Sequence, residues 1–284
     1  MTFLVFSNLF IALAAVAFTH ESYYLLGADP HLSPLLALVF CATLIVYDLD
    51  RLSGASSEDT VDATRRHRWV DRHRRLLWAT TGLAAIGAVT TLFFVPRALL
   101  WALIPLGLVS LGYSLPVIWS DSGPYRLKDI AGLKIFLISF VWAGATALLP
   151  AVEVLDDPLT PEVAWLIAER ALFIFAITLP FDIRDMDRDR HSAIWTIPLA
   201  VGPDRTRRLA YLAVAAFGVC VGLHYGLDWQ SPALPLWGSA TVTTALLSRA
   251  GRENHDEMYY VGWLDGMIPL QWAFVAGWAT CLPG

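Results

Sequence analysis

Long apolar stretches alternate with short polar segments along almost the whole chain. Most of these stretches approach the roughly 20 residues that an α-helix needs to cross about 30 Å of hydrocarbon. Nine are found, at residues 3–18, 35–49, 76–95, 98–119, 130–149, 163–181, 209–227, 233–247 and 258–281. The pattern predicts an all-α fold, a polytopic membrane bundle of about nine transmembrane helices without a separate soluble domain.

Basic residues are confined almost entirely to alternate connections between these stretches. The connections after the second, fourth, sixth and eighth stretches hold 17 of the 20 Lys and Arg residues. Connections rich in Lys and Arg face the cytoplasm. We therefore expect a multi-pass protein of the cell membrane, with its N-terminus in the cytoplasm and its C-terminus on the opposite side.

Two cations, Lys134 and Arg170, lie within or at the edge of an apolar stretch. A charge at that depth needs a partner or a polar cavity. Because Glu169 directly precedes Arg170, we interpret these two residues as an internal, mutually neutralising pair with a structural role.

Composition supports a membrane protein and excludes some partners. The chain is 56% apolar and 16% charged, with 12 Trp residues and a mean hydropathy of +0.54. Its net charge of −5 combines basic and acidic residues that lie on opposite sides of the membrane, so binding of nucleic acid is not indicated. The three cysteines lie in apolar surroundings without paired spacing, which indicates packing and no disulfide.

An acidic run, Pro180 to Asp189, ends the sixth apolar stretch. On a helix of about 100° per residue, Asp182, Asp185 and Asp189 fall within roughly 60° of one another, while Asp187 points elsewhere. Three carboxylates on one face attract a hard cation such as Mg²⁺, which prefers oxygen ligands and commonly bridges protein carboxylates to phosphate. The alternative is a solvated helix end whose acids are neutralised by Arg184, Arg188 and Arg190.

The second stretch also ends in acids, Asp48 and Asp50, followed by Arg51. Both acidic ends are expected on the cytoplasmic side, where they would hold one or two cations between them if their helices are neighbours. Asp48 lies about 200° from Asp50 on a regular helix, so both reach one site only if the helix unwinds. Asp50 is the stronger candidate.

Further polar groups are expected on the same side. Tyr113 ends the fourth stretch, and Arg126 and Lys128 follow it, as candidate donors to phosphate or as ordinary interfacial residues. The longest connection, about residues 51–75, starts with a polar run and continues with a basic run that fits a short helix. That run is either an anchor for anionic lipid or a lid over a phosphate site.

These motifs resemble the UbiA superfamily of intramembrane prenyltransferases. The second Asp-rich motif of that family is similar to Asp182, Asp185 and Asp189 with the downstream Thr196-Ile197-Pro198-Leu199 and Gly202, and its Tyr-Ser-x-Pro segment is similar to Tyr113-Ser114-Leu115-Pro116 followed by Lys128. The first motif departs from the pattern. Only Asp50-Arg51 stands in place, because Val46, Tyr47 and Gly54 occupy the other motif positions, and Lys134 lies near a position where many members carry Asn.

The resemblance implies a single transmembrane prenyltransferase-like domain over residues 1–284. It implies Mg²⁺-dependent transfer of an isoprenyl group from an isoprenyl diphosphate to a lipophilic acceptor, aromatic or lipid, within the membrane. The implied catalytic residues are Asp50, Asp182, Asp185 and Asp189, which together with Asp48 are the implied metal ligands. The implied diphosphate-binding residues are Tyr113, Arg126, Lys128, Arg51 and Lys134.

Two other functions compete with this one. A relative of the same fold would bind an isoprenoid or quinone without turning it over, and the incomplete first motif favours it. An ion-coupled transporter would also carry ionisable groups in its spans, but near the midplane and often at broken helices. The motifs specify neither the acceptor, the isoprenoid length nor the oligomeric state.

Overall fold

The fold is a bundle of long helices, seen in a computed structural model that describes residues 2–54, 65–120, 123–191, 195–228, 230–250 and 257–281. The long helical elements are α2 (Leu9–Leu25), α3 (Pro34–Gly54), α5 (Arg74–Leu92), α6 (Arg97–Ser114), α7 (Lys134–Ala143) continuing through η2 (Gly144–Leu148) into α8 (Leu149–Val154), α9 (Pro161–Arg184), α12 (Pro203–Tyr225), α13 (Ala233–Leu247), and η3 (Tyr259–Leu264) followed by α14 (Met267–Cys281). The prediction of an all-α fold is confirmed.

Shorter elements connect these helices. They are α1 (Thr2–Phe6), α4 (Arg65–Arg72), the antiparallel strands β1 (Ile118–Ser120) and β2 (Gly123–Tyr125), η1 (Leu127–Asp129), α10 (Met186–His191) and α11 (Ile197–Val201). Helix α4 is the short basic helix expected in the second connection, and it is held by edge-to-face contacts of Trp69 with Phe3 and Phe6. The polar run at 55–64 in that connection lies outside the described residues.

Each of the nine apolar stretches falls largely on helix. Within the described ranges, five helices are long and apolar enough to cross a membrane: Arg74–Leu92, Arg97–Ser114, Lys134–Val154, Pro161–Arg184 and Pro203–Tyr225. Helices α2 and α13 are apolar but shorter. Several helices suited to crossing a membrane are therefore present, and the number nine stays a prediction.

The first stretch differs from its predicted form. Helix α1 ends at Phe6, and a new helix begins after Asn8, whose φ of 60° is left-handed. Helix α2 then runs on past the predicted end at Phe18, because Glu21 is fully buried against polar partners and does not end the helix.

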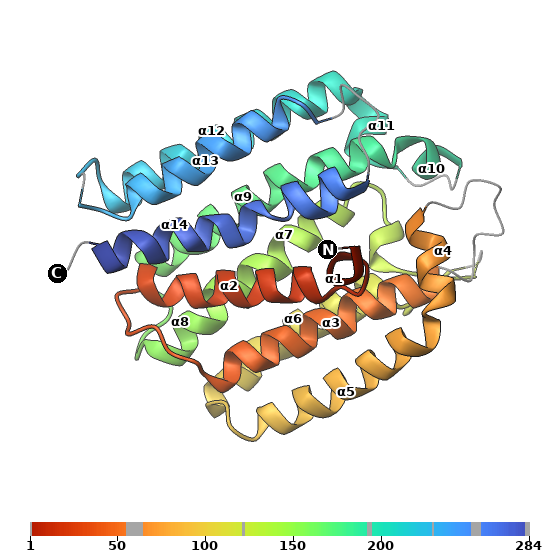
Figure 1. The fold of residues 1–284 in the computed structure, drawn as a ribbon, viewed down its shortest axis with the longest axis horizontal. Helices are drawn as coiled ribbons and strands as arrows, with labels where there is room; N and C mark the ends of the chain where they lie inside the picture. Colours follow the sequence, from red (N-terminus) through yellow and green to blue (C-terminus); the bar gives the residue numbers. More distant parts are fainter. Residues whose placement is uncertain are drawn as a thin grey trace.

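Helix α9 lies at the centre of the packing. It contacts α7 on one side and α12 on the other, while α2 packs against α3 and α14, and α3 packs against α5. Buried Phe173 and Ile177 place the middle of α9 in the main hydrophobic core. Figure 1 shows α4 and α10 at one end of the bundle, opposite the end of α14.

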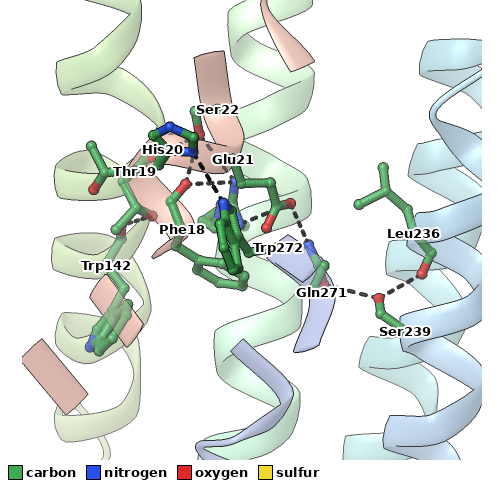
Figure 2. Close-up of polar contacts among 12 residues, drawn as sticks. Phe18, Thr19, His20, Glu21, Ser22, Trp142, Leu236, Ser239, Gln271 and Trp272 are labelled. Atoms are coloured by element: carbon green, nitrogen blue, oxygen red, sulfur yellow. Dashed lines mark hydrogen bonds and ion pairs between the residues drawn. The ribbon is translucent and has the colours of Figure 1, made fainter. Parts of the chain in front are cut away.

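A polar cluster crosses the core at the level of Glu21. Gln271 donates its side-chain amide to Glu21 over 3.0 Å and accepts a hydrogen bond from Ser239, so α2, α14 and α13 are linked, as Figure 2 shows. Arg170 forms an ion pair with Glu21 at 3.4 Å, while Glu169 pairs with His224 at 2.9 Å. The interpretation of Glu169 and Arg170 as one pair is therefore wrong, because adjacent residues of a helix point in different directions.

Candidate functional site

The predicted acidic ends lie at the same end of the bundle. Asp50 lies just before the last turn of α3, and Asp182 is in the last turn of α9, which leads into Asp189 on α10. Thr160 caps the start of α9 by accepting a hydrogen bond from the Val163 amide. From that cap the apolar sequence keeps α9 helical to Arg184, so it carries Asp182 to the end of the bundle near α10 (Figure 1).

Lys128 neutralises the acid of α3. Its ammonium group forms an ion pair with Asp50 and lies 5.5 Å from the ring centroid of Tyr113. Burial lowers the pKa of Lys128, and the negative charge of Asp50 opposes this effect. The predicted residues Asp50, Tyr113 and Lys128 therefore form one contact group.

Lys134 neutralises the acid of α9. Its ammonium Nζ lies 2.7 Å from Oδ1 of Asp182, whose residue is only 2% exposed. The same ammonium is also within electrostatic reach of Asp185 and Asp189. The sequence analysis predicted that Lys134 needs a partner, and that partner is Asp182 of the predicted acidic face.

The other two acids of this face have different surroundings. Asp185 accepts a forked pair of hydrogen bonds from Arg184, at 2.8 and 3.0 Å, and a contact from Arg188 at 2.8 Å. Although burial acts against it, this pairing holds the pKa of Asp185 below its usual value. Asp189 is 6% exposed, and its Oδ2 has no hydrogen-bond partner among the described residues. Burial raises the pKa of Asp189.

Both acidic ends belong to one polar cluster, with lysines between them. Lys128 and Lys134 are close enough to repel each other electrostatically. The Tyr113 hydroxyl is within electrostatic reach of both Asp50 and Asp182. The structure therefore brings the predicted residues of α3, α6, η1, α7 and α9 together.

Asp48 is not part of this cluster. Its carboxylate accepts hydrogen bonds from Asn8 at 2.6 Å, Thr80 at 2.9 Å and Thr81 at 3.2 Å, and the residue is fully buried. Helix α3 stays regular here, so Asp48 faces α5 and the start of α2, away from the side that carries Asp50. The structure does not bring Asp48 to the other predicted metal ligands.

The two predicted arginines lie at the margin of the cluster. The guanidinium group of Arg126 donates two hydrogen bonds, each 3.1 Å long, to the Asp129 carboxylate. The two residues thereby cap the start of η1. This pairing lowers the pKa of Asp129 against the opposing effect of burial. Arg51 is partly buried and within electrostatic reach of Tyr47 and Asp48.

Sequence reasoning missed some neighbours of the cluster. Asp265, which directly follows η3, is within electrostatic reach of Tyr47 on α3. Arg184, read only as a neutralising charge, lies 5.0 Å from the ring centroid of Tyr260 and 5.2 Å from that of Phe181. No sequence motif marks Asp265 or Tyr260, because the segment that carries them comes close to α3 and α9 only in the folded bundle.

The described residues form no ready-made metal site, and the acid of this cluster with a free oxygen ligand lies at the end of α9. Among the described residues, no group of three or more His, Cys, Asp or Glu side chains is arranged to hold a metal ion. The buried Oδ2 of Asp189, to which no described residue donates a hydrogen bond, is a hard oxygen ligand of the kind that Mg²⁺ takes, and Asp185 and Asp182 lie within electrostatic reach of it. At Asp50 the carboxylate is paired with Lys128 and Asp48 is turned away.

A family model described as the UbiA prenyltransferase family matches residues 71–258. No curated protein sequence matches the chain. Thus the sequence match rests on the family model, and it includes the second acidic motif and the segment with Tyr113 and Lys128.

Solved structures share the fold over nearly their whole length. A UbiA homolog from Archaeoglobus fulgidus bound to DMAPP and Mg²⁺ has a TM-score of 0.66 at 12% identity, covering 99% of this chain and 100% of that chain. The homolog from that organism bound to GPP and Mg²⁺ has a TM-score of 0.60 at 12% identity, covering 96% and 99%. An apo UbiA homolog from Aeropyrum pernix K1 has a TM-score of 0.56 at 14% identity, covering 98% and 96%. At these identities the likeness establishes the fold.

Proposed function

Because the chain belongs to the UbiA prenyltransferase family, we propose that it transfers an isoprenyl group from an isoprenyl diphosphate to a lipophilic acceptor in the membrane. The observation that carries this proposal is the convergence of Asp50 and the acids of α9 around Lys128 and Lys134. Related structures that bind DMAPP or GPP with Mg²⁺ support the donor class.

The charge of each residue in the cluster determines its proposed role. Lys128 and Lys134 would exchange their carboxylate partners for diphosphate oxygens, and Tyr113 would donate its hydroxyl to the same group. Arg126 and Arg51, at the margin, would add positive potential. A divalent ion held by Asp182, Asp185 and Asp189 would stabilise the negative charge that grows on the leaving diphosphate.

The same reasoning extends to the whole chain. We infer a single domain over residues 1–284 with the polar cluster at the cytoplasmic membrane surface. The N-terminus would then be cytoplasmic and the C-terminus on the opposite side, as the distribution of Lys and Arg indicates. The isoprenoid tail and the acceptor would enter from the membrane.

Because the acids of α9 lie at one end of the bundle, this arrangement favours the transferase over a transporter with a midplane site.

One experiment tests the proposal on the purified full chain. Geranyl diphosphate, Mg²⁺ and a total lipid extract as acceptor source are incubated with the protein, and prenylated product is measured by mass spectrometry. We expect Asp185→Asn to lower product formation by about 100-fold or more, the scale on which loss of one charge-stabilising group acts. The matched control is Asp187→Asn, because Asp187 is 90% exposed on the other side of the same segment.

The outcomes separate the candidate functions. Product formation that Asp185→Asn abolishes and Asp187→Asn leaves intact supports a transferase. Full activity of Asp185→Asn would remove Asp185 from the catalytic set. Binding of geranyl diphosphate without product or pyrophosphate release would instead identify a non-catalytic isoprenoid-binding relative. That alternative is favoured by a specific observation, the ion pairs that already occupy Asp50 and Asp182.

A further inference from the structure

The most basic segment of the chain lies where α4 leads into α5. Residues 65–75 contain six arginines and one acid, Asp71. Four of these arginines have exposed side chains in the part of the segment that the structure describes, and we call them the basic surface: Arg68, Arg72, Arg74 and Arg75. Figure 1 shows α4 at the end of the bundle where α5 begins.

The basic surface is not neutralised by acids of the protein. Other arginines hold a carboxylate three positions before them, as Arg190 holds Asp187 at 3.6 Å and Arg207 holds Asp204. By contrast, no ion pair joins an arginine of the basic surface to any residue that the structure describes. Because like charges gathered without counter-charges repel one another, this surface attracts an anionic partner.

Helix α4 is held to the bundle by its apolar side. Trp69 contacts Phe3 and Phe6 of α1 edge to face, and Val70 is buried in one cluster with Leu77 of α5. Helix α4 therefore packs against α1 and α5, neither of which carries a residue of the proposed diphosphate site. These packing partners are those of an anchor at the margin of the bundle and not of a lid over that site.

The exposed apolar face of α5 indicates the depth of the arginines. Trp78, Ile86 and Val89 are each more than half exposed, while Leu77 on the other side of α5 is fully buried. At about 100° per residue, Arg75 and the three exposed apolar residues fall within roughly 80° of one another. Since α5 is long and apolar enough to cross a membrane, that face meets lipid chains, and Arg75 lies at the headgroup level where the face ends.

We propose that the basic surface binds the headgroups of anionic phospholipids and holds α4 against the membrane surface. Each guanidinium group carries a planar fork of N–H donors that matches phosphate geometry. Exposed apolar side chains lie next to the arginines, because Trp78 is one turn from Arg75 and Phe3 contacts Trp69 beside Arg68. These apolar neighbours enter the hydrocarbon, so the partner is a lipid headgroup and not a soluble phosphate.

The test compares two variants with the same loss of charge. Native mass spectrometry measures binding of phosphatidylglycerol, and of phosphatidylcholine with the same acyl chains, to the detergent-purified full chain. Arg72→Gln with Arg75→Gln removes two arginines of the basic surface. The matched control, Arg190→Gln with Arg207→Gln, removes two arginines that are paired with acids.

The two variants should differ in their affinity for the anionic lipid. We expect the basic-surface variant to bind phosphatidylglycerol about 25-fold more weakly, because each basic residue at a membrane surface contributes about 5-fold. The control should change this affinity by less than about 2-fold, since its arginines are already neutralised. Affinity for phosphatidylcholine, which has no net charge, should stay the same in both.

Pyrophosphate affinity, measured by calorimetry on the same proteins, separates a lipid anchor from a lid. An anchor leaves this affinity unchanged when the basic surface is altered, whereas a lid over the diphosphate site loses it. Arg68→Gln with Arg74→Gln provides a second pair from the same surface. Monodispersity in detergent shows that each variant is folded.

Specific outcomes would overturn the proposal. One is unchanged phosphatidylglycerol affinity in both pairs from the basic surface. Another is an equal loss in the control, since binding would then follow net charge and not this surface. Loss of pyrophosphate affinity with retained lipid affinity would identify a lid. Because lipid binding requires no turnover, these results do not depend on whether the protein transfers an isoprenyl group.

Discussion

Asp48 and Asp50 are two residues apart, yet they have different surroundings. Asp50 meets Lys128 in the polar cluster, while Asp48 accepts three hydrogen bonds from α5 and from the residue before α2. Successive helix positions differ by about 100°, so two steps turn a side chain to nearly the opposite face. Asp48 therefore has a structural role in joining helices, while Asp50 lies in the polar cluster.

This difference predicts the effect of removing Asp48. Asp48→Ala removes the acceptor of the buried Asn8 amide, while the Thr80 and Thr81 hydroxyls keep the Leu77 carbonyl oxygen, and we expect the free energy of unfolding to fall by about 2 kcal/mol. The measurement is denaturant unfolding in mixed micelles, with Asp71→Ala on an exposed surface as the control. Loss of Mn²⁺ binding by folded Asp48→Ala would contradict the structural role.

At the scale of elements, the turn between η1 and α7 places both lysines. Gly132 in this turn has a φ of 70°, and a Cβ added there would lie 2.5 Å from Trp195. Its amide also donates to the Trp195 carbonyl oxygen over 3.0 Å. The backbone of residues 128–134 is thereby held against the segment that leads into α11, and with it the positions of Lys128 and Lys134.

A substitution in this turn should affect the site at a distance. Gly132→Ala adds backbone strain and a collision with Trp195, so we expect pyrophosphate affinity to fall by about 10-fold, roughly 1.4 kcal/mol of binding free energy. The matched control is Gly27→Ala. Gly27 also has a left-handed φ, 68°, but its added Cβ meets nothing within 4 Å. Equal losses of affinity in the two variants would refute a specific role for the turn.

At the scale of the whole molecule, the buried polar cluster of Figure 2 sets how the helices are aligned. Arg170 of α9 contacts Glu21 and Ser22 of α2 and lies 3.8 Å above the Phe18 ring. Glu21 in turn accepts from Gln271 of α14. These contacts fix the height of α9 relative to its neighbours, and so the height at which its acids emerge.

Removing a charge from this buried cluster should lower the free energy of unfolding more than removing a charge from the surface does. Arg170→Met leaves Glu21 as an uncompensated buried charge, and we expect a loss of about 3 kcal/mol in the free energy of unfolding. Adding Glu21→Gln should recover part of that loss, whereas Arg97→Met, at an exposed helix start, should change little. Additive losses from Arg170→Met and Glu21→Gln would show that the two side chains do not act as a pair.

The sequence by itself determined the helical membrane fold and the acidic face of α9, because bilayer thickness and helix periodicity translate directly into residue spacing. It also marked Lys134 and Arg170 as buried cations in need of partners. The tertiary structure decided which partners they have. Asp50 and Lys128 are 78 residues apart, and Asp182 and Lys134 are 48 apart, so no local pattern connects them. Packing of α3, α7 and α9 brings them together, and the same packing turns Asp48 away.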